Sequence, residues 1–330
     1  MGYEEYKDPA YDLKAYLKQY DPATWGKQEV SGPLEEARVR SQKNQAERIV
    51  INVGSNTSII GLGTDAKIVR GNLMLKQVDN VIIRNIEFQD AYDYFPQWDP
   101  TDGSEGNWNS EYDTVSLVGA THVWVDHCTF NDGERPDSMN ETYFGREYQH
   151  HDGLLDMTNG TDLVTVSYSV FSDHGKTSLI GSSDKSTTDE GRLRITFHHN
   201  WYQNVKERAP RVRFGQVHLY NNYYTVEEGH GYVYSWGVGY QSKIVAQNNY
   251  FELDSGIDPA SVIWPAKGTA IAETGTMVNG SFASLTDAYN AKAETKLSTS
   301  VGWEPELFDK IAPTQSVPAL VRAHAGAGKL

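Results

Sequence analysis

The chain has 330 residues, 38% of them hydrophobic, with 20 Tyr, 8 Trp and 29 Gly, a composition that favours a globular, turn-rich β protein over a helical bundle. Its formal net charge of −15 opposes nonspecific binding to nucleic acids and to anionic membranes. No window reaches the roughly 18 consecutive apolar residues of a membrane span, so we expect a soluble protein. We also expect a monomer with no nucleic-acid or membrane partner.

The first 48 residues are polar and differ in texture from the rest of the chain. Leu13, Tyr16, Leu17 and Tyr20 follow the i, i+3, i+4, i+7 spacing that is typical of an amphipathic helix. A charged stretch follows. We interpret residues 1–48 as an N-terminal flanking segment.

From Ile49 onward, short β-branched strands recur with polar turns between them. Each strand segment closes with an aromatic residue, and the closing residues are Phe88, Phe130, Phe171, Tyr202, Tyr224 and Phe251. They are spaced by 42, 41, 31, 22 and 27 residues, so the shortest spacing is one coil and the longer ones contain inserted loops. Strands at this repeat, without helical stretches between them, predict an all-β solenoid.

The repeat also predicts what surrounds the coils. Residues 90–113 and 131–149 are the two largest insertions, and such loops often carry binding function. Three residues before each closing aromatic stand Asn85, His127, Tyr168, His199, Asn221 and Asn248, which stacking of the coils would align. We predict one domain over 1–330, with coils and loops at 49–284 and a C-terminal tail at 285–330 that covers the end of the stack.

Acidic residues lie on or just after several strand segments. If Val123 and Val125 point inward, Asp126 points outward, and Asp152 and Asp156 share one face of a strand. Three outward carboxylates from neighbouring coils would form an all-oxygen site suited to Ca²⁺. Mg²⁺ is a weaker candidate, and a zinc site at the adjacent histidines 150 and 151 is disfavoured because neighbouring strand residues face opposite ways. Alternatively, each aspartate caps a turn or pairs with an arginine.

Basic residues are concentrated in the same region of this acidic chain. They are Lys176, Arg208, Arg211 and Arg213. Arginine suits bidentate recognition of carboxylates, so the natural partner is a polycarboxylate. Internal salt bridges to neighbouring aspartates are the alternative.

Four motifs in this order resemble the pectate lyase family of polysaccharide lyases, family 1, and in particular its bacillus-type enzymes. They are Trp124-Val125-Asp126-His127, Asp152-Gly153-Leu154-Leu155-Asp156, His174-Gly175-Lys176 and Arg208-Ala209-Pro210-Arg211-Val212-Arg213-Phe214-Gly215. The resemblance runs from about Tyr6 to Leu330. It implies a right-handed parallel β-helix, a secreted enzyme, Ca²⁺ as cofactor and polygalacturonate (pectate) as substrate.

The resemblance also implies roles for individual residues. Asp126, Asp152 and Asp156 would be the calcium ligands, and Arg208 would remove the substrate proton. Lys176 and Arg213 would bind substrate carboxylates, and Arg211 would support the strand or the substrate-binding subsite.

The implied reaction is β-elimination, in which loss of the C5 proton expels the C4 oxygen and leaves a 4,5-unsaturated product. An arginine base conflicts with the usual pKa of arginine, above ~12, unless Ca²⁺ and nearby cations depress it, and Lys176 is the alternative base. Two other classes are open: a β-helix polygalacturonase with Asp152 and Asp156 as acid and base, and a noncatalytic solenoid that binds acidic polysaccharide. Lys176 and Arg208 beside the carboxylates favour the lyase, because hydrolysis does not require them.

Overall fold

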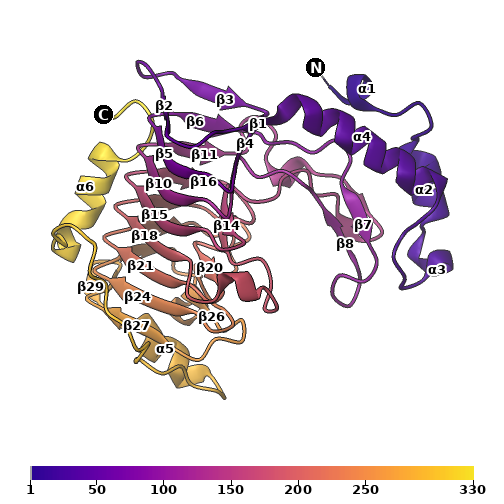
Figure 1. Ribbon diagram of the computed structural model, residues 1–330. Coiled ribbons are helices and arrows are strands. Elements are labelled where there is room, and N and C mark those ends of the chain that lie inside the picture. The colour runs from indigo at the N-terminus through magenta and orange to yellow at the C-terminus, as the bar shows by residue number, and fades with distance from the viewer. Residues whose placement is uncertain (1) are drawn as a thin grey trace.

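The computed structural model describes residues 2–330, and three long parallel sheets run side by side through it (Figure 1). The first sheet contains β1 (Val50–Asn52), β4 (Asn72–Lys76), β9 (Val115–Val118), β14 (Leu155–Thr158), β17 (Leu179–Ile180), β20 (Arg211–Val212), β23 (Trp236–Val238) and β26 (Ile263–Trp264). The second contains β2 (Thr57–Ile60), β5 (Asp79–Arg84), β10 (Thr121–Asp126), β15 (Asp162–Ser167), β18 (Arg194–His198), β21 (Gln216–Tyr220), β24 (Lys243–Gln247) and β27 (Ile271–Thr274).

The third sheet contains β3 (Lys67–Val69), β6 (Glu87–Gln89), β11 (Thr129–Asn131), β16 (Val170–Ser172), β19 (Trp201–Gln203), β22 (Tyr223–Val226), β25 (Tyr250–Leu253), β28 (Met277–Val278) and β29 (Ser281–Phe282). Neighbouring strands are parallel except for β28 and β29. Successive strands along the chain pass from one sheet to the next, so each turn of the chain is one coil. The predicted parallel β-helix is confirmed.

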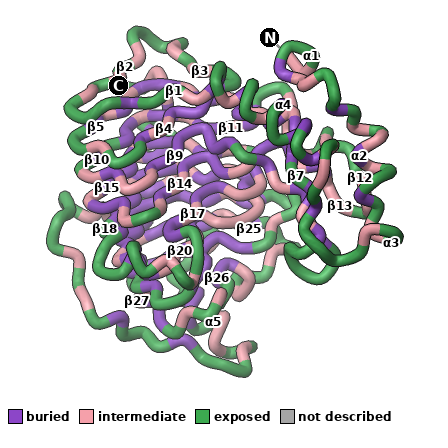
Figure 2. The backbone as a smooth tube through the Cα atoms, turned by 45° about the vertical axis from the view of Figure 1, so that its right-hand side comes forward, coloured by how far each residue is buried: buried purple, intermediate pink, exposed green. Residues whose placement is uncertain are grey.

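The closing aromatics form one continuous stack inside the coils. All five successive ring pairs from Phe88 to Phe251 are stacked, with centroids 4.2 to 5.1 Å apart. Burial of each such ring stabilises the fold by about 1.5–3 kcal/mol. Figure 2 shows the buried backbone concentrated in the coils.

The position three residues before each closing aromatic is a corner of the coil. All six residues there adopt a left-handed backbone, with φ between 45° and 59°. Their rings also stack where they are aromatic, as in His127 on Tyr168 and Tyr168 on His199. The next position points inward and carries a ladder in which Asn200, Asn222 and Asn249 hydrogen-bond one another at 3.0 and 3.1 Å. The corner needs a left-handed residue, and Asn and His tolerate that conformation better than most.

Four N-terminal helices form a lobe beside the first coils (Figure 1). They are α1 (Tyr3–Tyr6), α2 (Leu13–Gln19), α3 (Pro22–Trp25) and α4 (Pro33–Ile49). The helix predicted around Leu13 is α2, whose N-terminus is capped by the Asp12 carboxylate accepting from the main-chain nitrogen of Ala15.

The two large insertions pack onto this lobe. They fold into the hairpins β7 (Gln97–Asp99) with β8 (Asn107–Asn109) and β12 (Thr142–Tyr143) with β13 (Arg146–Glu147). Their aromatic side chains join those of α1 to α4 in a second hydrophobic core, which contains Trp98, Trp108 and Tyr16. Within it Arg38 of α4 is paired with Glu35 and donates to the main-chain oxygen of Phe95 at 2.8 Å.

The C-terminal tail begins with α5 (Leu285–Lys292), which packs against β26 and β27 at the end of the coils. It then crosses the second sheet, where Phe308 contacts His218, and reaches the third sheet, where Val317 and Val321 of α6 (Val317–His324) bury Tyr223. Gly328 finally donates to Asn85 near the first coils, at 2.6 Å. The short 3₁₀ turns are η1 (Asp137–Met139), η2 (Thr187–Asp189), η3 (Pro259–Val262) and η4 (Thr314–Ser316). Within residues 2–330 no helix is both long and apolar enough to cross a membrane.

Candidate active site

Three carboxylates converge on the first sheet around Gly153. Oδ1 of Asp113, just before β9, accepts from the main-chain nitrogen of Gly153 at 2.9 Å. A Cβ atom at position 153 would lie 2.4 Å from Asp156 Oδ1 and 2.9 Å from Asp113 Oδ1, so only glycine fits between them. Asp152 precedes this glycine directly and raises the pKa of both neighbouring carboxyl groups.

The electrostatics of these groups show that negative charge is crowded here. Burial and the neighbouring Asp152 raise the pKa of Asp113 to about 7. Burial, Asp113 and Asp152 raise the pKa of Asp156 well above its usual range. Because carboxylates in this position repel one another, the cluster favours either protons or a bound cation with oxygen ligands.

Asp126 lies elsewhere, and the predicted ligand set is corrected accordingly. It ends β10 of the second sheet and is only 1% exposed. Its carboxylate accepts hydrogen bonds from Arg84 Nε at 2.7 Å and from Ser167 Oγ at 2.6 Å. It is also hydrogen-bonded to His127 Nδ1 at 2.7 Å. Burial raises its pKa, but the bonds to His127 and Ser167 outweigh that effect and lower it. Asp126 is therefore satisfied within the second sheet and does not join Asp152 and Asp156.

Asp113 is the residue that the sequence patterns missed. It lies at the end of the insertion at residues 90–113, where it resembles part of a loop. The register of β9 with β14 pairs Val115 with Leu155 and Ser116 with Asp156. An alignment of the first-sheet strands, instead of the closing aromatic segments, is the signal that would have revealed Asp113.

Two predicted basic residues lie next to this cluster. The main chain of Lys176 forms isolated parallel β-bridges with Gly153 on one side and with Glu207 on the other. Its side-chain Nζ lies 3.2 Å from Asp152 Oδ1. Arg208 follows Glu207 and donates from Nε to its carboxylate at 3.0 Å. Burial lowers the pKa of Arg208, but Glu207 and more distant groups, including Asp156, raise it overall. In this charge environment Arg208 is a cation.

The other two predicted arginines differ in their partners. Arg213 donates from Nε to Asp184 at 2.9 Å and from Nη1 to the main-chain oxygen of Gly181 at 2.8 Å. Among residues 2–330, Arg211 has no carboxylate partner, and its buried Nε has no hydrogen-bond acceptor. Burial and then Arg213 lower the pKa of Arg211. Lys176, Arg208 and Arg213 therefore form internal salt bridges, as the alternative interpretation of the sequence predicts, whereas Arg211 does not.

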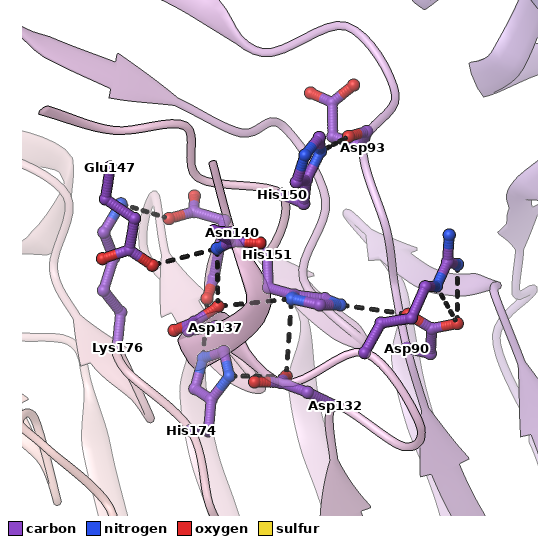
Figure 3. A network of polar contacts seen from close by, with 12 residues as sticks. Asp90, Asp93, Asp132, Asp137, Asn140, Glu147, His150, His151, His174 and Lys176 are labelled. Carbon is purple, nitrogen blue, oxygen red and sulfur yellow. Dashed lines mark hydrogen bonds and ion pairs between the residues drawn. The ribbon is translucent and has the colours of Figure 1, made fainter. Parts of the chain in front are cut away.

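A second polar cluster, which includes Asp132, Asp137, His151 and His174, lies next to the segment that carries Asp152 (Figure 3). His174 is bonded through Nδ1 to Asp132 Oδ1 and through Nε2 to the main-chain oxygen of Asp152, both at 2.7 Å. His151 lies between Asp90 and Asp137, at 3.1 and 3.4 Å. This network ties the insertion to the segment that carries Asp152.

Ligand atoms of Asp132, Asp137 and His151 lie within 4.8 Å of one another, so this second cluster could also hold a metal ion. Its carboxylates, however, already face histidines. Burial lowers the pKa of His151, but the bonds to Asp137 and Asp90 raise it to about 10, so a protonated ring balances their charge. In the cluster around Gly153 only Asp152 has such a partner, Lys176, and the pKa values of Asp113 and Asp156 stay raised, so this cluster is the better cation site.

Comparison with known proteins identifies the family. The family model described as "Pectate lyase" matches residues 25–330. The chain belongs to the pectate lyase family. It is 55% identical over 334 residues to a pectate lyase of Bacillus subtilis (strain 168), covering 100% of this chain and 78% of the relative. It is 38% identical over 319 residues to pectate lyase E of Dickeya chrysanthemi, covering 91% and 79%.

Solved structures of pectate lyases agree with this assignment. The thermostable pectate lyase PL 47 matches with a TM-score of 0.97 and 55% identity, covering 100% of this chain and 81% of that one. A pectate lyase bound to a hexasaccharide matches with a TM-score of 0.94 and 54% identity, covering 100% and 82%. The predicted family, fold and pectate lyase activity are confirmed.

Proposed function

We propose that this pectate lyase cleaves α-1,4-linked polygalacturonate by calcium-dependent β-elimination and releases 4,5-unsaturated oligogalacturonides. The observation that carries the proposal is the convergence of Asp113, Asp152 and Asp156 beside Lys176 and Arg208. Carboxylates and cations this close together suit a substrate that is itself a polycarboxylate.

The donor set fits Ca²⁺. Asp113, Asp152 and Asp156 offer only carboxylate oxygens, which Ca²⁺ prefers. Burial and mutual repulsion raise the pKa values of Asp113 and Asp156 despite the nearby Lys176 and Arg208, so a further cation would be stabilised there. When bound, Ca²⁺ would supply charge that stabilises the anion formed next to the uronate carboxylate. Asp126 has no part in this proposal.

Arg208 is the proposed base, and Lys176 is the alternative. In its neutral, deprotonated form Arg208 would accept the C5 proton; the electrons of the C5–H bond form the C4–C5 double bond, and the C4–O bond breaks. The leaving oxygen takes a proton from water. Because Glu207 and Asp156 raise the pKa of Arg208, neutralisation of nearby carboxylates would make its deprotonation easier, and we expect an alkaline optimum.

The remaining cations would bind substrate carboxylates. Lys176 and Arg213 keep their internal acid partners, Asp152 and Asp184, and a uronate carboxylate would share them. Within the described residues Arg211 has no carboxylate partner, so a substrate carboxylate would supply one. Because the polymeric substrate lies outside cells, we also propose a secreted, monomeric enzyme, which culture-medium activity and sedimentation would test.

One assay tests the reaction. The protein is incubated with polygalacturonate in Ca²⁺ or in excess chelator, and the ultraviolet absorbance of the unsaturated product is followed. We expect absorbance to rise only with Ca²⁺. New reducing ends without that absorbance would indicate a hydrolase, and binding without either product would indicate a noncatalytic solenoid. Full turnover in chelator would reject the calcium role.

A further inference from the structure

The outward face of the first sheet continues beyond the active site along one line of residues. Leu179, whose nitrogen donates to Asp156 Oδ1 at 2.9 Å, pairs in register with Arg211. Arg211 pairs with Gly237, and Gly237 pairs with Trp264. We call Arg211, Gly237 and Trp264 the distal strip. At a spacing of about 4.8 Å per strand, Trp264 lies roughly 19 Å along the sheet from Asp156.

The glycine of the distal strip makes room for the arginine. A Cβ atom at position 237 would lie only 2.9 Å from Arg211 Cγ. Without that atom, the Arg211 side chain crosses the strand, and its guanidinium lies 4.8 Å from the ring centroid of Trp264. The strip is therefore a continuous surface in which a cation meets an aromatic ring.

Both ends of this surface are available to a ligand. Trp264 is 40% exposed, and its ring is supported by buried Tyr234, with centroids 4.9 Å apart. Arg211 has no carboxylate partner within residues 2–330 and a buried Nε without an acceptor. An unpaired cation in a chain of net charge −15 indicates an anion that comes from outside the protein.

A second Arg–Trp pair in the same chain shows the contrast. Trp124 of β10 is 37% exposed, and the Arg84 guanidinium lies 5.2 Å from its ring centroid. Arg84, however, is already paired with Asp126 at 2.7 Å. On the second sheet the charge of Arg84 is thus neutralised by Asp126, whereas on the first sheet Arg211 has no carboxylate partner within the described residues.

We propose that Arg211 and Trp264 form a distal subsite for one galacturonate residue of the polysaccharide. The C–H groups of the sugar ring pack against the part of Trp264 that Arg211 and Tyr234 leave exposed, and Arg211 binds the sugar carboxylate through its two terminal nitrogens. The inference rests on the proposed function and extends it: the polysaccharide lies along the first sheet, across the strands, and chains that reach Trp264 are preferred over short ones.

The test compares polygalacturonate with trigalacturonate, which is too short to span from Asp156 to Trp264. For Trp264→Ala we expect KM for polygalacturonate to rise about tenfold, which is a loss typical of one aromatic or cation–π contact, with trigalacturonate kinetics unchanged. Arg211→Gln should also raise KM for polygalacturonate, and Trp264→Phe should retain most of the affinity. Trp124→Ala is the matched control and should change neither substrate's KM.

Several outcomes would overturn the subsite. Equal losses on both substrates would mean that Trp264 acts through the fold or the central site, and unchanged KM on both would mean that no sugar binds there. If Trp264→Ala does not fold, Trp264→Leu decides on the same comparison. If wild-type protein makes no unsaturated product, the proposed function fails, and calorimetric binding of polygalacturonate to wild type and Arg211→Gln decides the subsite separately.

Discussion

The main-chain nitrogen of Gly153 donates a hydrogen bond to Asp113 Oδ1 at 2.9 Å, which joins two coils of the first sheet at the candidate cation site. This contact, and not the position of Asp126, defines the third carboxylate. The proposed ligands can therefore be separated from a structural aspartate by mutation.

Asp113→Asn should lower Ca²⁺ affinity at least about tenfold, because it removes one of three charged oxygen ligands, while the fold is retained. Isothermal calorimetry with Ca²⁺ measures this directly. Asp126→Asn is the contrasting variant, because it weakens the bonds to Arg84 and His127. It should lower the free energy of unfolding by about 1–3 kcal/mol with little effect on Ca²⁺ affinity. The opposite pattern would restore Asp126 as a ligand.

Gly153→Ala should abolish most activity without unfolding the coils. The added methyl would lie 2.4 Å from Asp156 Oδ1, so the two carboxylates must separate. We expect Ca²⁺ affinity to fall at least about tenfold. The control is Gly54→Ala, where the nearest atom to a new Cβ would be 3.9 Å away. Normal Ca²⁺ affinity in Gly153→Ala would show that the carboxylates do not act together.

Arg208→Lys should lower kcat about 10²- to 10⁴-fold, because proton transfer depends on the reach and pKa of the base. Ca²⁺ binding and affinity for polygalacturonate should change little, which is the pattern of an interaction made in the transition state. Arg192→Lys, at an exposed position on the surface, serves as the control. Normal turnover, or a loss of substrate affinity alone, would favour Lys176 as the base.

A histidine pair at the corner after β18 should make the protein sensitive to acid. Nδ1 of His198 and Nδ1 of His199 are 2.9 Å apart, so one must accept, and both rings cannot be fully protonated. Burial, His199 and His218 lower the pKa of His198 to about 3, although Asp126 and Asp309 oppose this shift. Burial lowers the pKa of His199 to about 4, and Asp309 opposes it.

In the unfolded chain these histidines become protonated near pH 6.5, whereas in the folded chain they become protonated only at about pH 3–4. The contribution of this pair to the free energy of unfolding is therefore fully present above pH 6.5 and decreases as the pH falls below that value. Calorimetry at pH 7 and 4.5 should show a smaller fall in Tm for the double variant His198→Gln/His199→Gln than for wild type. His230→Gln, on an exposed loop, should leave the fall unchanged. An equal fall in the double variant would contradict the prediction.

Local patterns in the sequence determined the coil. Each closing aromatic, such as Phe130, must enter the core because strand side chains alternate, and the residue three positions earlier must form the left-handed corner. These rules involve only neighbouring residues, so an all-β solenoid and the order of its motifs could be read directly. The same motifs were specific enough to predict the family and, through that resemblance, the parallel β-helix.

Tertiary structure alone decided which side chains meet. Alternation gives the face on which Asp126 or Asp156 lies, but not which of the three sheets its strand joins, and that assignment placed Asp126 beside Arg84 instead of Asp152. The insertion at residues 90–113 interrupts the repeat and concealed Asp113, whose bond to Gly153 spans 40 residues. The approach of Arg211 to Trp264 likewise depends on the missing Cβ of Gly237 in an intervening coil, a contact between strands that no local spacing encodes.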